Sequence, residues 1–134
     1  MTSILAAITA SIAITAFRQQ AYVEPQAMLT TAYCDYGITK SGVIVREGIC
    51  AGKEEWLGKT VILYERKEDG SIGELLGIYE CLDTGFGGDS DGDGIGSIQE
   101  GKVIDVYFET LDRCKDWMKR TNGKVYMQLI DAEG

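Results

Sequence analysis

Six short β-like runs and one late amphipathic helix place the strongest limits on the fold of this chain. The sequence lacks the regular strand–helix alternation that builds a parallel sheet covered by helices. The predicted strands occupy residues 29–33, 42–46, 59–66, 75–82, 102–108 and 124–130. Short strands with few connecting helices favour a closed barrel, because closure leaves no unpaired sheet edge. We therefore predict a mostly β fold, a small six-stranded barrel.

A single α-helix is predicted in the C-terminal half, at about residues 110–122. Thr110 is a suitable N-cap, and Asn122 followed by Gly123 provides the usual end of a helix. The apolar side chains that recur on one face are Leu111, Cys114, Trp117 and Met118. We expect this face to cover the barrel, with Trp117 as a core residue and not a cofactor contact.

The 134 residues provide for one domain after an apolar N-terminal segment. Residues 1–17 fit the apolar part of a signal peptide or a membrane tether, or else a buried helix of a cytosolic protein. We assign residues 1–20 to a signal peptide or membrane anchor, 21–28 to a tether and 29–134 to the barrel domain. This assignment predicts a secreted or envelope-associated protein outside the cytoplasm.

The charge and composition limit the chemistry that the domain can perform. Its net charge of −8 lacks the basic footprint of a nucleic-acid-binding protein, so no nucleic acid partner is expected. Because the chain has no histidine, carboxylates are the leading candidates for acid–base chemistry. Its four cysteines are compatible with two disulfides in any of three pairings, or with four free thiols.

An acidic segment between two predicted strands, residues 89–100, has the spacing of a calcium-binding loop. Carboxylates stand at loop positions 1, 3, 5 and 12, and a glycine stands at position 6. The predicted ligands of a structural Ca²⁺ are Asp89, Asp91, Asp93, the carbonyl of Ile95, Ser97 and Glu100. Unlike an EF-hand, the segment has Gly96 at position 8 and no flanking helices, so a solvated acidic turn without metal is the alternative.

Two aspartates occupy positions where a carboxylate has no packing role. Asp105 interrupts an apolar strand, and strand alternation gives it Val103 and Tyr107 as neighbours on its face. Such a setting raises the pKa of a carboxyl and favours a proton donor near neutral pH. Asp83, at a strand end, is freer to accept hydrogen bonds and stay ionised. Carboxylates with separated pKa values can cleave a glycosidic bond, although a pair of turn and surface aspartates is the alternative.

Short sequence words follow one another in a characteristic order between residues 29 and 130. They are Thr31-Ala32-Tyr33, Thr39-Lys40-Ser41-Gly42, Leu57-Gly58-Lys59-Thr60-Val61, Asp83-Thr84-Gly85, the strand around Asp105, a helix with Trp117, and Val125-Tyr126-Met127. In this order they resemble the 3D (triple-aspartate) domain.

This family has a double-psi β-barrel fold and includes membrane-bound lytic transglycosylases and small Gram-positive stationary-phase survival proteins.

The resemblance implies an enzyme that cleaves the MurNAc–GlcNAc bond of peptidoglycan without water and leaves a 1,6-anhydro end. Asp105 would protonate the glycosidic oxygen and then, as a base, take the proton of the C6 hydroxyl. Asp83 would stabilise the positive charge that develops on the sugar. The residues expected to line the cleft are Thr31, Tyr33, Thr39 and Thr84.

The chain departs from the family pattern in two places. The first family aspartate falls on residues 50–53, which contain none, so Glu54 or Glu55 would have to replace it. The acidic segment also lengthens the connection between the second and third aspartates. The competing function is a non-catalytic, calcium-stabilised module that binds cell-wall glycan on the same barrel.

Overall fold

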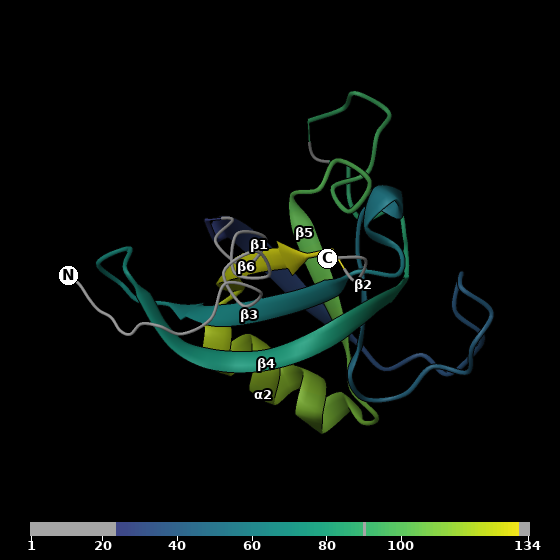
Figure 1. The fold of residues 1–134 in the computed structure, drawn as a ribbon, viewed down its shortest axis with the longest axis horizontal. Coiled ribbons are helices and arrows are strands. Elements are labelled where there is room, and N and C mark those ends of the chain that lie inside the picture. Colours follow the sequence, from purple (N-terminus) through teal and green to yellow (C-terminus); the bar gives the residue numbers. More distant parts are fainter. Residues whose placement is uncertain (1–23, 90, 132–134) are drawn as a thin grey trace, which may run out of the picture.

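The computed structural model describes residues 24–89 and 91–131, in which six strands form a closed barrel (Figure 1). The strands are β1 (Gln26–Tyr33), β2 (Ile49–Ala51), β3 (Thr60–Arg66), β4 (Ile72–Asp83), β5 (Val103–Tyr107) and β6 (Lys124–Ile130). A 3₁₀-helix, η2 (Glu54–Trp56), follows β2, and the α-helix of the described part is α2 (Leu111–Thr121). The predicted class, mostly β with six strands and one helix, is confirmed.

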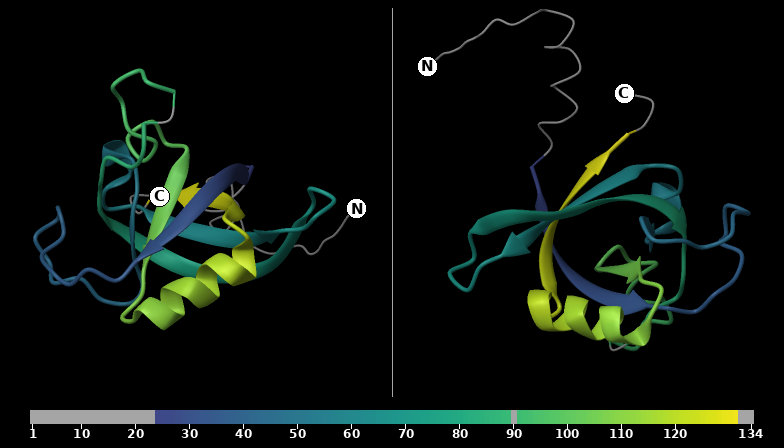
Figure 2. Two further views of the ribbon diagram at one scale, coloured as in Figure 1. Left: turned by 180° about the vertical axis from the view of Figure 1, so that it is seen from behind. Right: turned by 90° about the horizontal axis from the view of Figure 1, so that it is seen from below.

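The strands pair around the barrel in the order β1-β5-β2-β4-β3-β6. The pairs β1–β5 and β2–β4 are parallel, and the other four pairs are antiparallel. Exchanging β1 with β4, β2 with β5 and β3 with β6 leaves every pairing unchanged. Two halves of equal topology therefore build the barrel, as expected of a double-psi arrangement, and Figure 2 shows the strands curving into a ring.

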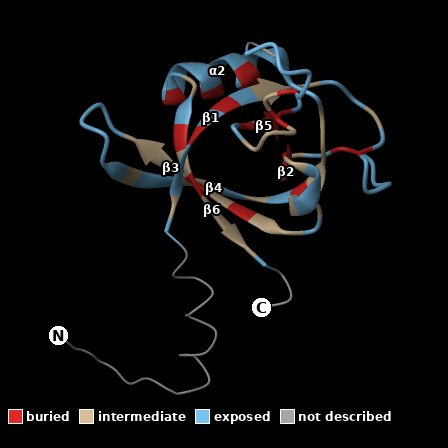
Figure 3. Ribbon diagram, turned by 90° about the horizontal axis from the view of Figure 1, so that it is seen from above, coloured by how far each residue is buried: buried red, intermediate tan, exposed pale blue. Residues whose placement is uncertain are grey.

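The core lies inside this ring and is covered on one side by α2 (Figure 3). Alternation along β5 turns Ile104 and Val106 inward, and both are fully buried. The ring of Trp117 on α2 packs against Phe108 at a centroid distance of 5.6 Å, and its Nε1 donates to Thr30 Oγ1 at 3.0 Å. The predictions that Trp117 belongs to the core and that Thr110 caps the helix are confirmed, because Thr110 accepts from the backbone N of Arg113.

Two predictions made from the sequence of the N-terminal half are wrong. Residues 42–46 form no strand; only an isolated bridge joins Ile38 to Ile44. The strand that completes the barrel is β2, whose three residues are all buried between β4 and β5. Residues 26–28, predicted as part of a tether, belong to β1, and the side chain of Met28 is buried in the core.

The predicted signal peptide or membrane anchor, residues 1–20, lies outside the described residues. Among residues 24–89 and 91–131, no helix has both the length and the apolar character needed to cross a membrane. The two structural features that matter for the site are the loop between β1 and β2, residues 34–48, and the acidic loop between β4 and β5, residues 84–102.

Candidate active site

Asp83 and Asp105 lie on two strands that flank the short strand β2. Ala51 of β2 is in register with Asp83 on β4 and with Asp105 on β5, so a single strand separates the aspartates. At the usual spacing of neighbouring strands, their backbones are roughly 10 Å apart. Both aspartates line one cleft of about 330 Å³, and the small Ala51 side chain leaves the space between them open.

Asp105 is partly buried on β5. The buried residues Val103 and Tyr107 are its neighbours on β5, and Thr31 Oγ1 donates to its Oδ1 at 2.8 Å. The pKa of Asp105 is raised from 3.8 to about 6. Burial is the largest cause and the charges of Asp83 and Asp35 add to it, while the Thr31 hydrogen bond opposes the shift. Asp105 is therefore suited to donate a proton near neutral pH, as its place in an apolar strand predicted.

Asp83 lies among hydrogen-bond donors at the end of β4. The backbone amides of Thr84 and Lys40 each donate to its Oδ1 at 3.0 Å, and the hydroxyl of Tyr33 donates to its Oδ2 at 3.3 Å. Burial, together with the charges of Asp83 and Asp105, raises the pKa of Tyr33, so its hydroxyl remains protonated and able to donate. These three donors hold the carboxylate of Asp83 in a fixed orientation.

Three of the four predicted cleft residues contact the two aspartates. Thr31 donates to Asp105, Tyr33 donates to Asp83, and the Thr84 amide donates to Asp83. The prediction that Thr39 lines the cleft is wrong. Its side chain is only 4% exposed, and its hydroxyl accepts from the backbone N of Val43 within a tight turn.

A third carboxylate reaches the cleft from the loop that follows β1. Asp35 lines the cleft, and its charge contributes to the raised pKa of Asp105. Glu54 and Glu55, the predicted replacements for the missing family aspartate, lie exposed on η2 and outside the residues that line the cleft. Sequence reasoning missed Asp35, because its place beside Asp105 follows from the pairing of β1 with β5 and not from a local pattern.

Gln99 connects the acidic loop to the turn after Asp83. Its Nε2 donates to Thr84 Oγ1 at 3.0 Å and to the carbonyl of Gly85 at 2.6 Å. Thr84 Oγ1 in turn donates to the carbonyl of Gly52, just after β2, at 2.8 Å. A change in the conformation of the acidic loop can therefore shift, through these hydrogen bonds, the backbone of the turn that follows Asp83.

The two ends of the acidic loop are joined by a narrow neck. Ser97 N donates to the carbonyl of Gly88 at 2.8 Å, and Ile98 N donates to the carbonyl of Phe86 at 3.1 Å. A Cβ on Gly96 would clash with the carbonyl oxygen of Phe86. This close approach explains why glycine stands where EF-hand loops carry an apolar residue.

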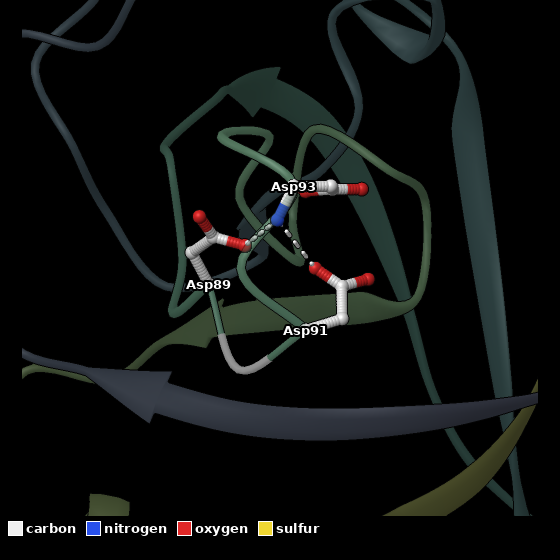
Figure 4. Close-up of side chains that lie close together, drawn as sticks. All are labelled: Asp89, Asp91 and Asp93. Carbon is white, nitrogen blue, oxygen red and sulfur yellow. Dashed lines mark hydrogen bonds between the residues drawn. The ribbon is translucent and has the colours of Figure 1, made fainter.

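Three aspartates converge at the tip of this loop and could hold a metal ion (Figure 4). Oxygen atoms from Asp89, Asp91 and Asp93 lie within 4.8 Å of one another. The Asp93 amide donates to Asp89 Oδ1 at 3.2 Å and to Asp91 Oδ1 at 3.3 Å, and the Gly94 amide donates to Asp89 Oδ2 at 2.9 Å. These bonds curl the backbone so that alternate carboxylates face one centre.

The other three predicted metal ligands are Glu100, Ile95 and Ser97. Glu100 lies beside Asp93, which raises the pKa of Glu100, and the Lys102 ammonium is 3.4 Å from both Glu100 and Asp91. Ile95 approaches through its amide, which donates to Asp93 Oδ1 at 2.8 Å. The hydroxyl of Ser97 lies against Gly87, where it leaves no room for a side chain. The structure therefore gathers three of the four predicted carboxylates at one centre, with Glu100 beside Asp93 but outside that group, and it does not bring in the Ser97 hydroxyl.

The comparisons with known proteins give no further guide to this site. No protein-family model, curated protein or solved structure matches the chain. The cleft itself combines one carboxyl with a pKa of about 6 and one carboxylate held by three donors, and both aspartates line the same open space. Such a pair can donate a proton to a substrate and stabilise a nearby positive charge.

Proposed function

We propose that the protein is a peptidoglycan lytic transglycosylase that cleaves the MurNAc–GlcNAc β-1,4 bond and leaves a 1,6-anhydro-MurNAc end. The observation that carries this proposal is the pairing of Asp105, with its raised pKa, and the hydrogen-bonded Asp83 in one cleft. The order of sequence words shared with the 3D domain supports glycan strands as the substrate. We further propose an extracytoplasmic location, with residues 1–17 as an export signal or membrane tether.

In the proposed reaction, the carboxyl of Asp105 donates its proton to the glycosidic oxygen while the bond from this oxygen to MurNAc C1 breaks. Positive charge develops on the MurNAc ring and is stabilised by the carboxylate of Asp83. The C6 hydroxyl of the same sugar then attacks C1 and transfers its proton to Asp105. One carboxyl can serve both steps because the substrate supplies the nucleophile, and the acid is regenerated without water.

The walls of the cleft support a sugar polymer as the ligand. Tyr36 and Ile38 line it from the loop after β1, and their side chains are 77% and 69% exposed. Exposed apolar side chains beside polar groups are typical of ligand-binding grooves. An aromatic ring and an aliphatic chain offer a surface for the apolar face of a pyranose, while Asp35, Asp83 and Asp105 provide polar contacts.

The identity of the reaction products provides the direct test. Purified protein is incubated with bacterial sacculi, and the soluble muropeptides are analysed by liquid chromatography and mass spectrometry. The proposal requires 1,6-anhydro-MurNAc ends, which are lighter than hydrolysed ends by one water. Hydrolysed ends would show that the chain is a hydrolase. Co-sedimentation with sacculi without released muropeptides would instead establish the non-catalytic glycan-binding module.

We also propose that the metal held by the acidic loop is a structural Ca²⁺. The spacing of Asp89, Asp91, Asp93 and Glu100 and the hard oxygen donors they offer support this ion. A bound cation would relieve the repulsion among these carboxylates, which Lys102 now offsets from one side. Through Gln99, an ordered loop would help to hold the turn that carries Thr84.

Calcium is accordingly expected to raise the thermal stability of the protein. At one hundred times the dissociation constant, binding to the folded state adds roughly 3 kcal/mol to the free energy of unfolding. Melting temperatures in EDTA and in excess Ca²⁺ measure this gain. The Asp91→Asn variant should lose most of the response, whereas Asp112→Asn, on the exposed first turn of α2, should keep it. An unchanged melting temperature in the parent protein would exclude the calcium site.

A further inference from the structure

The four cysteines are free thiols in this structure, but they lie in two close pairs. Cys50 on β2 is the direct register partner of Cys81 on the parallel strand β4, and both are fully buried. Each thiol also perturbs the other, so that the pKa of Cys50 is raised and that of Cys81 is lowered. Directly opposed residues on neighbouring strands have Cα atoms about 5 Å apart, within the range that a disulfide bridges.

The second pair joins the end of β1 to the helix. Cys34 follows β1 directly, and Cys114 lies on the buried face of α2. Burial, with a smaller contribution from the neighbouring Cys34 thiol, raises the pKa of Cys114 to about 11. Cys34 packs against the core cluster that contains Cys114.

We infer that the mature protein carries two disulfides, Cys34–Cys114 and Cys50–Cys81. The sequence alone allows three pairings, and each of the other two would require both contacting pairs to separate. The inference stands on the positions of the four thiols and is independent of the proposed catalytic function.

Each bond forms by thiol–disulfide exchange with an external disulfide, such as oxidised glutathione or a disulfide-exchange protein. Two cysteine thiols lose two protons and two electrons in total, and the external disulfide is reduced to two thiols. Because Cys50 and Cys81 are fully buried, their oxidation has to occur before the barrel closes around them. The cross-links therefore form during folding in an oxidising compartment.

Both bonds would brace the candidate active site. Cys50 directly precedes Ala51, and Cys81 lies two residues before Asp83, so one bond would join the two strands on one side of the cleft. Cys34 lies between Tyr33 and Asp35, so the bond to Cys114 would fix the start of the loop that lines the cleft.

Peptide mapping tests the pairing directly. The full-length chain is reduced, denatured and refolded in detergent with a mixture of oxidised and reduced glutathione, and the remaining thiols are alkylated in denaturant so that buried thiols also react. Digestion without reduction followed by mass spectrometry should recover the linked peptides Cys34–Cys114 and Cys50–Cys81, with no alkylated cysteine. Alkylation of all four cysteines in the refolded protein would overturn the inference, as would linked peptides with any other pairing.

Single substitutions provide the matched controls. In the Cys34→Ser variant, at the partly exposed position, Cys114 should become the only alkylated cysteine while the Cys50–Cys81 link persists. In Cys81→Ser, Cys50 should be alkylated and the Cys34–Cys114 link should remain. Should Cys81→Ser fail to fold, the Cys34→Ser result alone decides the pairing, since a surviving link other than Cys50–Cys81 would contradict it.

Discussion

Replacing Asp105 by asparagine is expected to lower the release of 1,6-anhydro-muropeptides by roughly 10³-fold while the protein remains folded. Asparagine can still accept the hydrogen bond from Thr31, but it can neither give a proton to the glycosidic oxygen nor take one from the C6 hydroxyl. Initial rates of anhydro-muropeptide release, with circular dichroism to verify folding, measure the effect. The control is Asp116→Asn on the exposed surface of α2, which should match the parent.

The pH dependence of the same reaction identifies the group that acts. Asp105 has to be protonated to begin the reaction, so the parent rate should fall as the pH rises above about 6, its pKa in the folded protein. The charge of Asp83 contributes to that raised pKa, so Asp83→Asn should move this limb to lower pH as well as slow the reaction. An Asp105→Asn variant that digests sacculi at the parent rate would refute the proposed mechanism.

The fold could be predicted from the sequence largely because most of its strands are long enough to show their pattern. The run at residues 59–66 and the helix with its Thr110 cap emerged nearly at their observed bounds. β2 could not be found in this way, because three buried residues show no alternation. The apolar residues Val43 and Ile44 led to the wrong prediction of a strand at residues 42–46, yet both are exposed on the loop between β1 and β2.

The candidate site was predictable only where a residue departed from its local pattern. Asp105 stood out as a charge in an apolar strand, and Asp83 stood out at a strand end. Asp35 and Ala51 gave no such signal, because their places beside the pair follow from the way β1, β5, β2 and β4 become neighbours when the barrel closes. The prediction for Thr39 was wrong for a related reason. A short sequence motif does not show whether the Thr39 hydroxyl faces the cleft or, as here, accepts a hydrogen bond from the backbone N of Val43.

Asp105→Asn is also expected to make the protein more stable at neutral pH, by up to about 3 kcal/mol, even as it loses activity. The folded carboxyl has a pKa of about 6 against 3.8 without the shift, a difference of about two units at 1.36 kcal/mol each. Between these values the folded state keeps a proton that the unfolded chain releases. The contribution of Asp105 to the free energy of unfolding is therefore greatest below about pH 4 and is lost as the pH rises through about 6. The asparagine variant does not titrate and avoids this loss.

Urea unfolding of the parent and the variant between pH 4 and pH 8 tests this expectation. The two free energies of unfolding should lie closest at pH 4, where the folded carboxyl is protonated and the unfolded one is only partly ionised, and diverge in favour of Asp105→Asn as the pH rises. Asp116→Asn should follow the parent at every pH. A variant less stable than the parent at pH 8 would mean that ionised Asp105 is held by favourable contacts and serves the fold. The opposite result is what a catalytic acid kept at a cost to stability requires.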